Sequence, residues 1–343
     1  MSLFVKVRTR LTTVGTGLWL IMAGLVCPAM AADGLSLAVV APGADHFAWE
    51  SAERFAKLAA EDGVAVQPVM ASDEAASALL LPLRSLATRV PALQVMELPF
   101  LFHDLDTVHA ALDGELGGLL RRQARQRGWE ILAFWDEGMH ALSGNRRYDR
   151  AINLTGMEFI LLRPDPVAEK QFTALDAWTR AARPQSREQL LRECMIGSRS
   201  ASLQQIWRER LDRVHLDLTL SGHRYEGWVV VAAEPFWQGL SQQDRKKLQV
   251  LSAAATVWQR GDARQRNTAA LARLRASGMS VYRLSQAQRD AFVKRLPSWK
   301  RLLSDRLDNA LKTDLVTAAT AGFVSRRDES QALPDPEPGT PGG

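Results

Sequence analysis

The longest helical pattern in the sequence runs from residue 241 to residue 278, and it sets a minimum size for the fold. Ser241 and Asp244 form a capping box, and apolar residues recur every three or four positions from Leu248 onward. An unbroken helix of this length would reach roughly 50 Å at ~1.5 Å per residue, which exceeds one small domain. We therefore expect one helix that contacts two domains; the alternative is two helices broken at Gly261.

The first part of the chain after residue 34 predicts an α/β arrangement. Residues 35–40 (LSLAVV) have the composition of a buried strand, residues 46–63 place apolar side chains at helical spacing, and residues 64–69 form a second strand-like run. A strand, a helix and a strand in succession favour parallel pairing. The same kind of alternation continues along the chain. Further strands are expected at 129–136, 158–162, 216–220 and 227–232, and helices at 106–126, 167–181, 186–194 and 201–213.

The N-terminus has the pattern of a secretory signal peptide over residues 1–31. Basic residues precede an apolar run at 16–26 and a small-x-small site at 29–31, so we expect cleavage after Ala31 or Ala32 and export to the periplasm. The apolar run is short for a membrane span. The alternative is an uncleaved anchor or a lipoprotein.

Removal of that peptide changes the charge of the chain. The sequence has 43 basic and 38 acidic residues, and three of the bases lie in the peptide, which leaves 40 against 38. This near balance argues against a nucleic-acid partner. Of the two cysteines, Cys27 would be removed and Cys194 retained, so no disulfide is expected.

Common catalytic and cofactor motifs are missing from the sequence. It contains no G-x-G-x-x-G, P-loop, G-x-S-x-G or H-E-x-x-H, and its six histidines have no metal-ligand spacing. We therefore expect no cofactor, no metal and no enzymatic activity, although the members of a serine–histidine–carboxylate triad are too far apart in sequence to be recognised. The proline-rich residues 325–343 are expected to be disordered.

Residues 90–120 (VPALQVMELPFLFHDLDTVHAALDGELGGLL) closely resemble a segment of the substrate-binding proteins of TRAP transporters, the tripartite ATP-independent periplasmic transporters, of the DctP type. Residues 132–147, 152–159 and 218–248 resemble further segments of that family in the same order. The resemblance spans roughly residues 35–300.

This resemblance implies a two-lobed α/β periplasmic-binding-protein fold, joined by crossing strands and a long helix over both lobes. The first lobe would comprise 34–142 and 229–260, and the second 143–228 and 261–322. It also implies that the protein captures a small organic, anionic solute and delivers it to membrane permease subunits. The alternatives are the same fold acting as an envelope interaction or sensory protein, and an enzyme on this fold.

Within this resemblance, Phe100 and Phe102 are expected in the first lobe's core rather than at a ligand. Family members hold the ligand carboxylate with an arginine whose position falls here on Ile160, or on Leu161 if the register shifts. Nearby Arg163 is therefore a candidate replacement, because a guanidinium bonds a carboxylate through two parallel N–H groups. The alternative is a surface residue paired with Asp165.

Five further residues are candidates for the ligand site and its hinge. A second family arginine falls on His140, and Arg199 in the stretch GSRSA is a possible new anion contact. Trp135 and Trp228 would stack on a ligand or pack in the core. Tyr225, with His223, matches positions near the hinge.

Overall fold

The structure is a computed structural model that describes residues 36–41, 47–70 and 78–330. The expected signal peptide and residues 331–343 lie outside this part of the chain. No helix in the described ranges is both long enough and apolar enough to cross a membrane.

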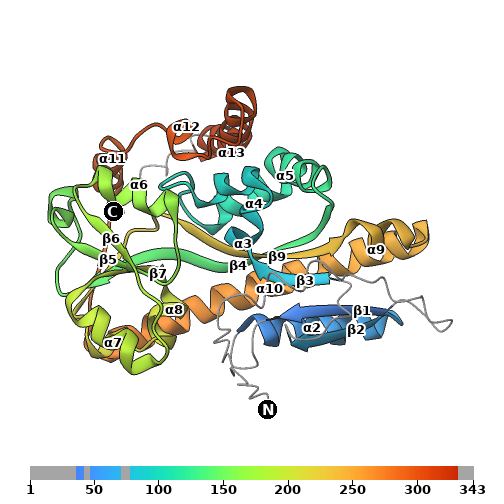
Figure 1. The fold of residues 1–343 in the computed structure, drawn as a ribbon, viewed down its shortest axis with the longest axis horizontal. Coiled ribbons are helices and arrows are strands. Elements are labelled where there is room, and N and C mark those ends of the chain that lie inside the picture. Colours follow the sequence, from blue (N-terminus) through green and yellow to red (C-terminus); the bar gives the residue numbers. More distant parts are fainter. Residues whose placement is uncertain (1–35, 42–46, 71–77, 331–343) are drawn as a thin grey trace, which may run out of the picture.

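The first half of the large sheet follows the order β2–β1–β3–β9–β4 (Figure 1). Its strands are β1 (Ser36–Ala41), β2 (Ala65–Met70), β3 (Ala78–Pro82), β9 (Tyr225–Ala233) and β4 (Trp129–Gly144). β1 is parallel to β2 and β3, whereas β9 is antiparallel to β3 and β4. The expected strand–helix–strand start is confirmed, and β3 was missed.

Strand β4 belongs to both halves of the molecule. It pairs with β9 over Trp129–Met139, and from His140 it pairs with β7 (Arg199–Ser202) and then β8 (Asp217–Leu220). Its 16 residues span roughly 50 Å at ~3.3 Å per residue. The expected end at residue 136 is wrong, because β4 only shifts its register against β9 there and continues with new partner strands from His140.

The second half of the sheet is completed by β10 (Ser280–Arg283), which is parallel to β8. Beside it lies a separate parallel pair, β5 (Glu158–Leu161) with β6 (Trp178–Ala181). β6 was expected to be the end of a helix. The chain leaves that helix earlier, because Leu175 ends it and Asp176 adopts a left-handed conformation with φ 55°.

Helices cover both faces of the first half of the sheet. They are α2 (Phe47–Glu61), α3 (Leu83–Ala87), η1 (Pro91–Glu97), α4 (Leu105–Asp113), α5 (Glu115–Arg125) and α9 (Glu234–Gly239). One apolar cluster joins the inner residues of η1, α4 and α5 to β9. A second joins α2 and the long helix α10 (Gln242–Ala276) to the opposite sheet face. The single helix expected at 106–126 is two helices, because the chain turns at Gly114.

The second half has its own apolar clusters, built on different helices. These are η2 (Ala151–Leu154), α6 (Pro166–Ala174), α7 (Arg187–Ile196), α8 (Leu203–Arg208), η3 (Leu211–Arg213) and α11 (Gln286–Val293). A short helix, α12 (Trp299–Leu302), follows them in the chain, but its Leu302 shares the apolar cluster of η1, α4 and α5. The helix expected at 201–213 begins later and is interrupted at Arg210, where φ is 59°.

Helix α10 (Gln242–Ala276) is unbroken over 35 residues, so the alternative of two helices separated at Gly261 is wrong. It passes beneath β4 and β9 and reaches both halves of the molecule (Figure 1). The Gln259 side-chain amide bonds the backbone N–H and C=O of Asp136, each at 2.8 Å. The Asn267 amide donates to the carbonyl oxygen of Glu137 at 2.7 Å. These bonds fix the helix to β4 where that strand changes partners.

The last helix, α13 (Asn309–Ser330), packs on α4 and α5. Its residues Leu315 and Ala319 share an apolar cluster with Leu112 and Leu120 of those helices. We therefore propose the expected division into two lobes with one change, in which α12 and α13 join the first lobe. Because α13 extends to Ser330, it also includes the first residues of the tail that was expected to be disordered.

The segment Leu98–Phe102 connects the two lobes. Leu98, Leu101 and Phe102 are buried in the first-lobe cluster as expected, but the Phe100 side chain packs into a second-lobe cluster. Phe100 has a φ of 56°, and its ring stacks on Phe292 with centroids 5.7 Å apart. The prediction of its burial is confirmed, and the prediction of which core it joins is wrong.

Candidate functional site

Four arginines from both lobes converge on one small cavity. Arg84 lies in α3 just after β3, Arg163 follows β5, Arg199 lies in β7, and Arg224 precedes β9. All four line a cavity of about 40 Å³ that His140 also borders. We call these four residues the arginine cluster. The volume holds about three water molecules, which is the scale of one carboxylate group.

Buried carboxylates neutralise part of this cluster. The Arg224 Nη2 lies 2.8 Å from the Oδ2 of Asp165, a residue that also caps helix α6. Arg84 pairs with Glu226 and lies 3.7 Å from Asp165. The Oε2 of Glu97 is 3.8 Å from Arg224, and its Oε1 has no hydrogen-bond partner among the described residues.

These carboxyl groups titrate differently because their surroundings differ. Burial, and then the charge of Asp165, raises the pKa of Glu97 to about 7. Burial acts to raise the pKa of Asp165 too, but Arg224 and Arg84 outweigh it and lower the value. Burial also acts to raise the pKa of Glu226, but the positive charge of Arg84 is the main effect that outweighs it. The pKa of Glu226 is therefore held well below its usual range. Glu97 is thus the carboxyl of the site that gains or loses a proton near neutral pH.

His140 lies at the centre of a buried hydrogen-bond chain. Its Nε2 is 2.9 Å from the Oε2 of Glu226, and its Nδ1 is 2.9 Å from the Oγ of Ser200. The chain continues to His223 and Ser221. Burial lowers the pKa of His140, and an ionised Glu226 only accepts, so a neutral His140 donates from Nε2 and accepts at Nδ1.

The connectivity of Ser200, His140 and Glu226 resembles that of a catalytic triad. However, the Ser200 hydroxyl also accepts a hydrogen bond from the Nε2 of His223, and the adjoining space of about 40 Å³ is too small for an ester substrate. The chain therefore fixes the orientation of His140. In the described ranges, no group of three or more His, Cys, Asp or Glu residues is arranged to hold a metal ion.

Arg199 is paired with other residues of the protein, whereas Arg163 has no described partner. Arg199 donates two bonds from Nη2 to Glu209 at 3.0 and 3.1 Å, and one from Nη1 to the carbonyl oxygen of Ile160 at 2.9 Å. Arg163 is exposed and has no hydrogen bond or ion pair within the described part of the chain. Desolvation, and then the positive charge of Arg84, lowers the pKa of Arg163. An anion between Arg84 and Arg163 would relieve that repulsion.

The three aromatic candidates lie away from this cavity. Trp135 and Trp228 are buried in the cluster shared by α2 and α10, where Trp135 packs edge-on against Phe55 at 6.0 Å. The Trp228 Nε1 donates to Glu137 at 3.0 Å. Tyr225 donates its hydroxyl to Asp136 at 2.9 Å and borders a separate cavity of about 10 Å³. The structure thus joins His140, Arg163 and Arg199 at one cavity and places the aromatic residues elsewhere.

Sequence reasoning missed Arg84, Glu97, Arg224 and Glu226. Two of these had a signal in the sequence. Glu97 is a single carboxylate within the apolar stretch VMELPFLF, and Arg224 directly precedes the buried strand β9. Arg84 has no such signal, because its partners lie far away in the chain.

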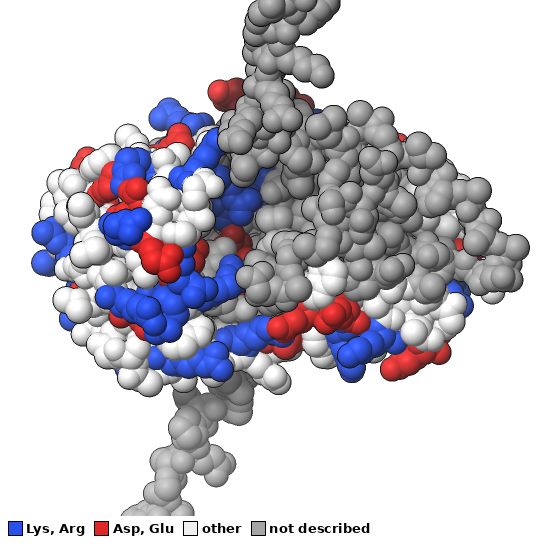
Figure 2. All heavy atoms as spheres, turned by 60° about the horizontal axis from the view of Figure 1, so that its bottom comes forward, with Lys and Arg blue, Asp and Glu red and all other residues white. Residues whose placement is uncertain are grey.

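The described surface is otherwise of mixed charge. Figure 2 shows acidic and basic side chains alternating along the lower edge of the described part of one face. Alternation of this kind agrees with the nearly balanced composition.

Comparison with known proteins gives a consistent result. The family model described as bacterial extracellular solute-binding protein, family 7 (DctP), matches residues 66–304. The C4-dicarboxylate-binding periplasmic protein DctP of Rhodobacter capsulatus is 24% identical over 231 residues, 66% of this chain and 67% of that protein. The C4-dicarboxylate-binding protein DctB of Bacillus subtilis is 27% identical over 208 residues, 60% of this chain and 59% of that protein.

Solved structures with the same fold include TRAP periplasmic solute-binding proteins. One from Ochrobactrum anthropi, with its C-terminus bound in the ligand-binding pocket, has a TM-score of 0.74 and 21% identity, and the match covers 88% of this chain and 99% of that chain. One from Shewanella oneidensis with bound succinate has a TM-score of 0.69 and 21% identity, covering 84% and 100%. The two-lobed α/β fold expected from the sequence is confirmed.

Proposed function

Because this chain belongs to family 7 of the bacterial extracellular solute-binding proteins, the DctP family, we propose that it binds a small organic carboxylate between its two lobes. The family description is that of a binding protein rather than an enzyme. Two relatives are C4-dicarboxylate-binding proteins, and similar folds hold succinate or L-malate. These relationships support a small dicarboxylate as the first class of solute to test.

One observation carries the proposal. Four arginines line the small cavity between the lobes, and Asp165 is the one acidic residue among the lining side chains. Arg163 is the arginine of this group without a described partner, so its guanidinium is free to bond both oxygens of a solute carboxylate. In this assignment Arg163 replaces the family arginine that is absent at Ile160. Arg84 supplies a second positive charge, and His140 borders the same cavity.

Arg199, Tyr225, Trp135 and Trp228 have supporting roles in this proposal. Arg199 holds β5 and α8 together through Ile160 and Glu209. Tyr225 and the two tryptophans anchor β4 and β9, the strands that connect the lobes. They set the position of the arginine cluster without contacting the solute.

The cellular setting that we propose follows from the family and the N-terminal sequence. Residues 1–31 direct export to the periplasm and are removed, and the mature protein delivers its solute to the permease subunits of a TRAP transporter. An envelope interaction or sensory role on the same fold is not favoured, because the cavity keeps its excess of arginines.

Calorimetric titration of the mature protein with succinate and L-malate tests the proposal. We expect binding to the wild type and loss of at least about 100-fold in affinity in the double variant His140→Ala with Arg163→Ala, since removing one partner of a charge pair that the bound solute buries costs roughly 2–5 kcal/mol. Arg187→Ala, an exposed arginine on α7, is the matched control and should bind like the wild type. Unchanged affinity in the double variant would contradict the site assignment.

Absence of binding to every small mono- or dicarboxylate tested would contradict the function itself. Small-angle scattering adds a second readout, because closure of two lobes around a solute makes the molecule more compact. A saturating carboxylate should reduce the radius of gyration of the wild type and leave that of the double variant unchanged.

A further inference from the structure

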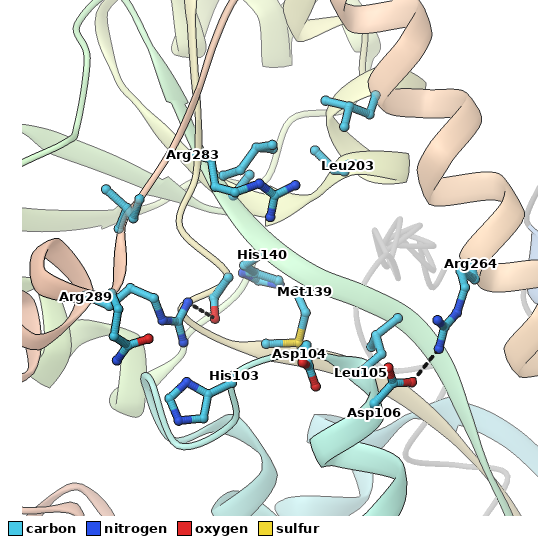
Figure 3. Close-up of a pocket in the computed structure, with 16 residues that line it drawn as sticks. His103, Asp104, Leu105, Asp106, Met139, His140, Leu203, Arg264, Arg283 and Arg289 are labelled. Atoms are coloured by element: carbon cyan, nitrogen blue, oxygen red, sulfur yellow. Dashed lines mark hydrogen bonds and ion pairs between the residues drawn. The ribbon is translucent and has the colours of Figure 1, made fainter. Parts of the chain in front are cut away.

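A second and larger cavity lies beside β4, away from the arginine cluster. It has a volume of about 400 Å³, within the roughly 300–1,000 Å³ of small-molecule sites. Its walls come from α4, β4, α10, β10 and α11, and we call it the β4–α10 cavity (Figure 3). Among the residues that the structure describes, His140 alone borders both this cavity and the cavity of the arginine cluster. The two spaces are therefore separate sites on either side of one strand.

Apolar side chains form much of the β4–α10 cavity. Met139 on β4, Leu203 on α8, Leu220 on β8 and Leu271 on α10 all line it and are only partly buried. These four apolar side chains come from four different elements and surround one cavity. Apolar residues on a protein surface are more often scattered singly. The four side chains offer apolar contact to a molecule with a flat or branched hydrocarbon body.

Three guanidinium groups approach the same space from different sides (Figure 3). Arg264 is paired with Asp106 at 2.6 Å. Arg289 is held by the carbonyl oxygens of Ser221, Gly222 and Phe102, and no described carboxylate pairs with it. Its position is therefore fixed by neutral carbonyl groups, and Asp104 and Asp290 act on its charge only from beyond ion-pair distance.

Arg283 is the second cation at this cavity that has no ion pair with a described carboxylate. It lies at the end of β10, is exposed, and forms no hydrogen bond or ion pair with the described residues. In Figure 3 its guanidinium extends over the cavity between His140 and Leu203. Of the two acidic residues that line the space, Asp106 is used by Arg264, and Asp104 caps α4 by accepting from the backbone N–H of Thr107.

From this combination we propose that the β4–α10 cavity is a second binding site, for a small aromatic or branched monocarboxylate. The hydrocarbon body contacts Met139, Leu203 and Leu271, and the carboxylate pairs with Arg283 and faces Arg289. The proposal does not depend on the proposed function, because it involves none of the arginine cluster.

Methionine methyl NMR with 2-naphthoate as the probe tests the site directly. Mature protein carrying ¹³C-methyl methionine is titrated with the probe, and the Met139 signal is assigned with Met139→Leu. We expect a saturable shift of that signal. Arg283→Ala should weaken binding by at least about fivefold, whereas Arg275→Ala, an exposed arginine on α10 outside the cavity, should leave it within twofold.

Further variants separate this site from the other cavity. Leu271→Trp fills the β4–α10 cavity and should abolish the shift, whereas Arg163→Ala should not change it. The neutral analogue 2-naphthamide should bind at least about fivefold more weakly than the acid. The proposal is overturned if the Met139 signal does not move, if Arg283→Ala binds like the wild type, or if Arg163→Ala alone removes binding. Titration with succinate in the same samples reports independently on the arginine cluster.

Discussion

At the scale of single residues, Glu97 links the candidate site to pH. Its pKa of about 7 in the folded protein lies above the ordinary value of 4.5, so the folded state holds a proton that the unfolded state has released. Between these two values the unfolding free energy falls as pH rises. Well above pH 7, Glu97 is ionised in both the folded and the unfolded protein, so the unfolding free energy no longer changes with its titration.

This titration makes a prediction about Glu97→Gln. The unfolding free energy of the wild type relative to the variant should fall by about 1–3 kcal/mol from pH 4.5 to pH 8, because one pKa unit corresponds to about 1.4 kcal/mol. Carboxylate affinity in the wild type should weaken over the same range, since ionised Glu97 adds negative charge near Arg224. Denaturant melts and titrations at several pH values measure both quantities. Parallel pH profiles for the two proteins would contradict the assignment.

Glu226 makes the opposite prediction. Its pKa is held well below 4.5 chiefly by Arg84, so its contribution to stability is present above pH 4.5 and lost as pH falls below it. Glu226→Ala should lower the unfolding free energy by about 3–5 kcal/mol at pH 7, because Arg84 and His140 lose a buried partner. Glu50→Ala, which removes an exposed partner of Arg266, should cost less than about 1 kcal/mol. Equal losses in the two variants would show that the buried network is no stronger than a surface pair.

The comparison with family segments singled out His140, Arg163 and Arg199, and these three residues line the same cavity. Sequence reasoning also paired Arg163 with Asp165 as one alternative, whereas Asp165 pairs with Arg224 and Arg84. Such pairings join residues about 60 to 80 positions apart, and no local periodicity encodes them. The roles of the six candidate residues therefore stay predictions that depend on the binding experiments.

At the scale of elements, Gly138 permits the register shift of β4 against β9 that precedes its change of partners at His140. It lies at the irregularity after Asp136 with a φ of 149°, and a side chain there would meet the Asn267 amide at 2.7 Å. Asn267 cannot withdraw freely, because it bonds the carbonyl oxygens of Glu137 and Ala263. The strand predicted from the sequence ended at residue 136, next to this irregularity. A shift in register interrupts the alternation of a strand in the same way as its end does.

Gly138→Ala should therefore destabilise the protein by about 1–3 kcal/mol, the usual cost of a residue held in a strained conformation. Gly261→Ala is the matched control, because Gly261 lies inside α10 with open space around its Cα. That substitution should stabilise the protein by about 0.5–1 kcal/mol through helix propensity. Chemical denaturation of the two variants measures the contrast, and similar effects in both would contradict a special role for Gly138.

At the scale of the whole molecule, the α/β class, the long helix and the two lobes were predictable from the sequence. Apolar periodicity in residues 241–278 was strong enough to show even across Gly261. The return of α13 to α4 and α5 was not predictable, because its partners are about 200 residues earlier in the chain. Phe100 joined the other lobe's core for the same kind of reason, since its ring packs on Phe292.

The bonds from Gln259 and Asn267 to β4 have a consequence for how the protein melts. Neither lobe has a closed set of elements, since α10 and β4 each contribute to both cores and α13 returns to the first. Loss of one lobe would strip apolar partners from the other, so the lobes cannot melt one at a time. We expect a single heat-absorption peak in scanning calorimetry, with equal calorimetric and van't Hoff enthalpies. Two separated peaks would mean that the shared helix and strand do not transmit stability between the lobes.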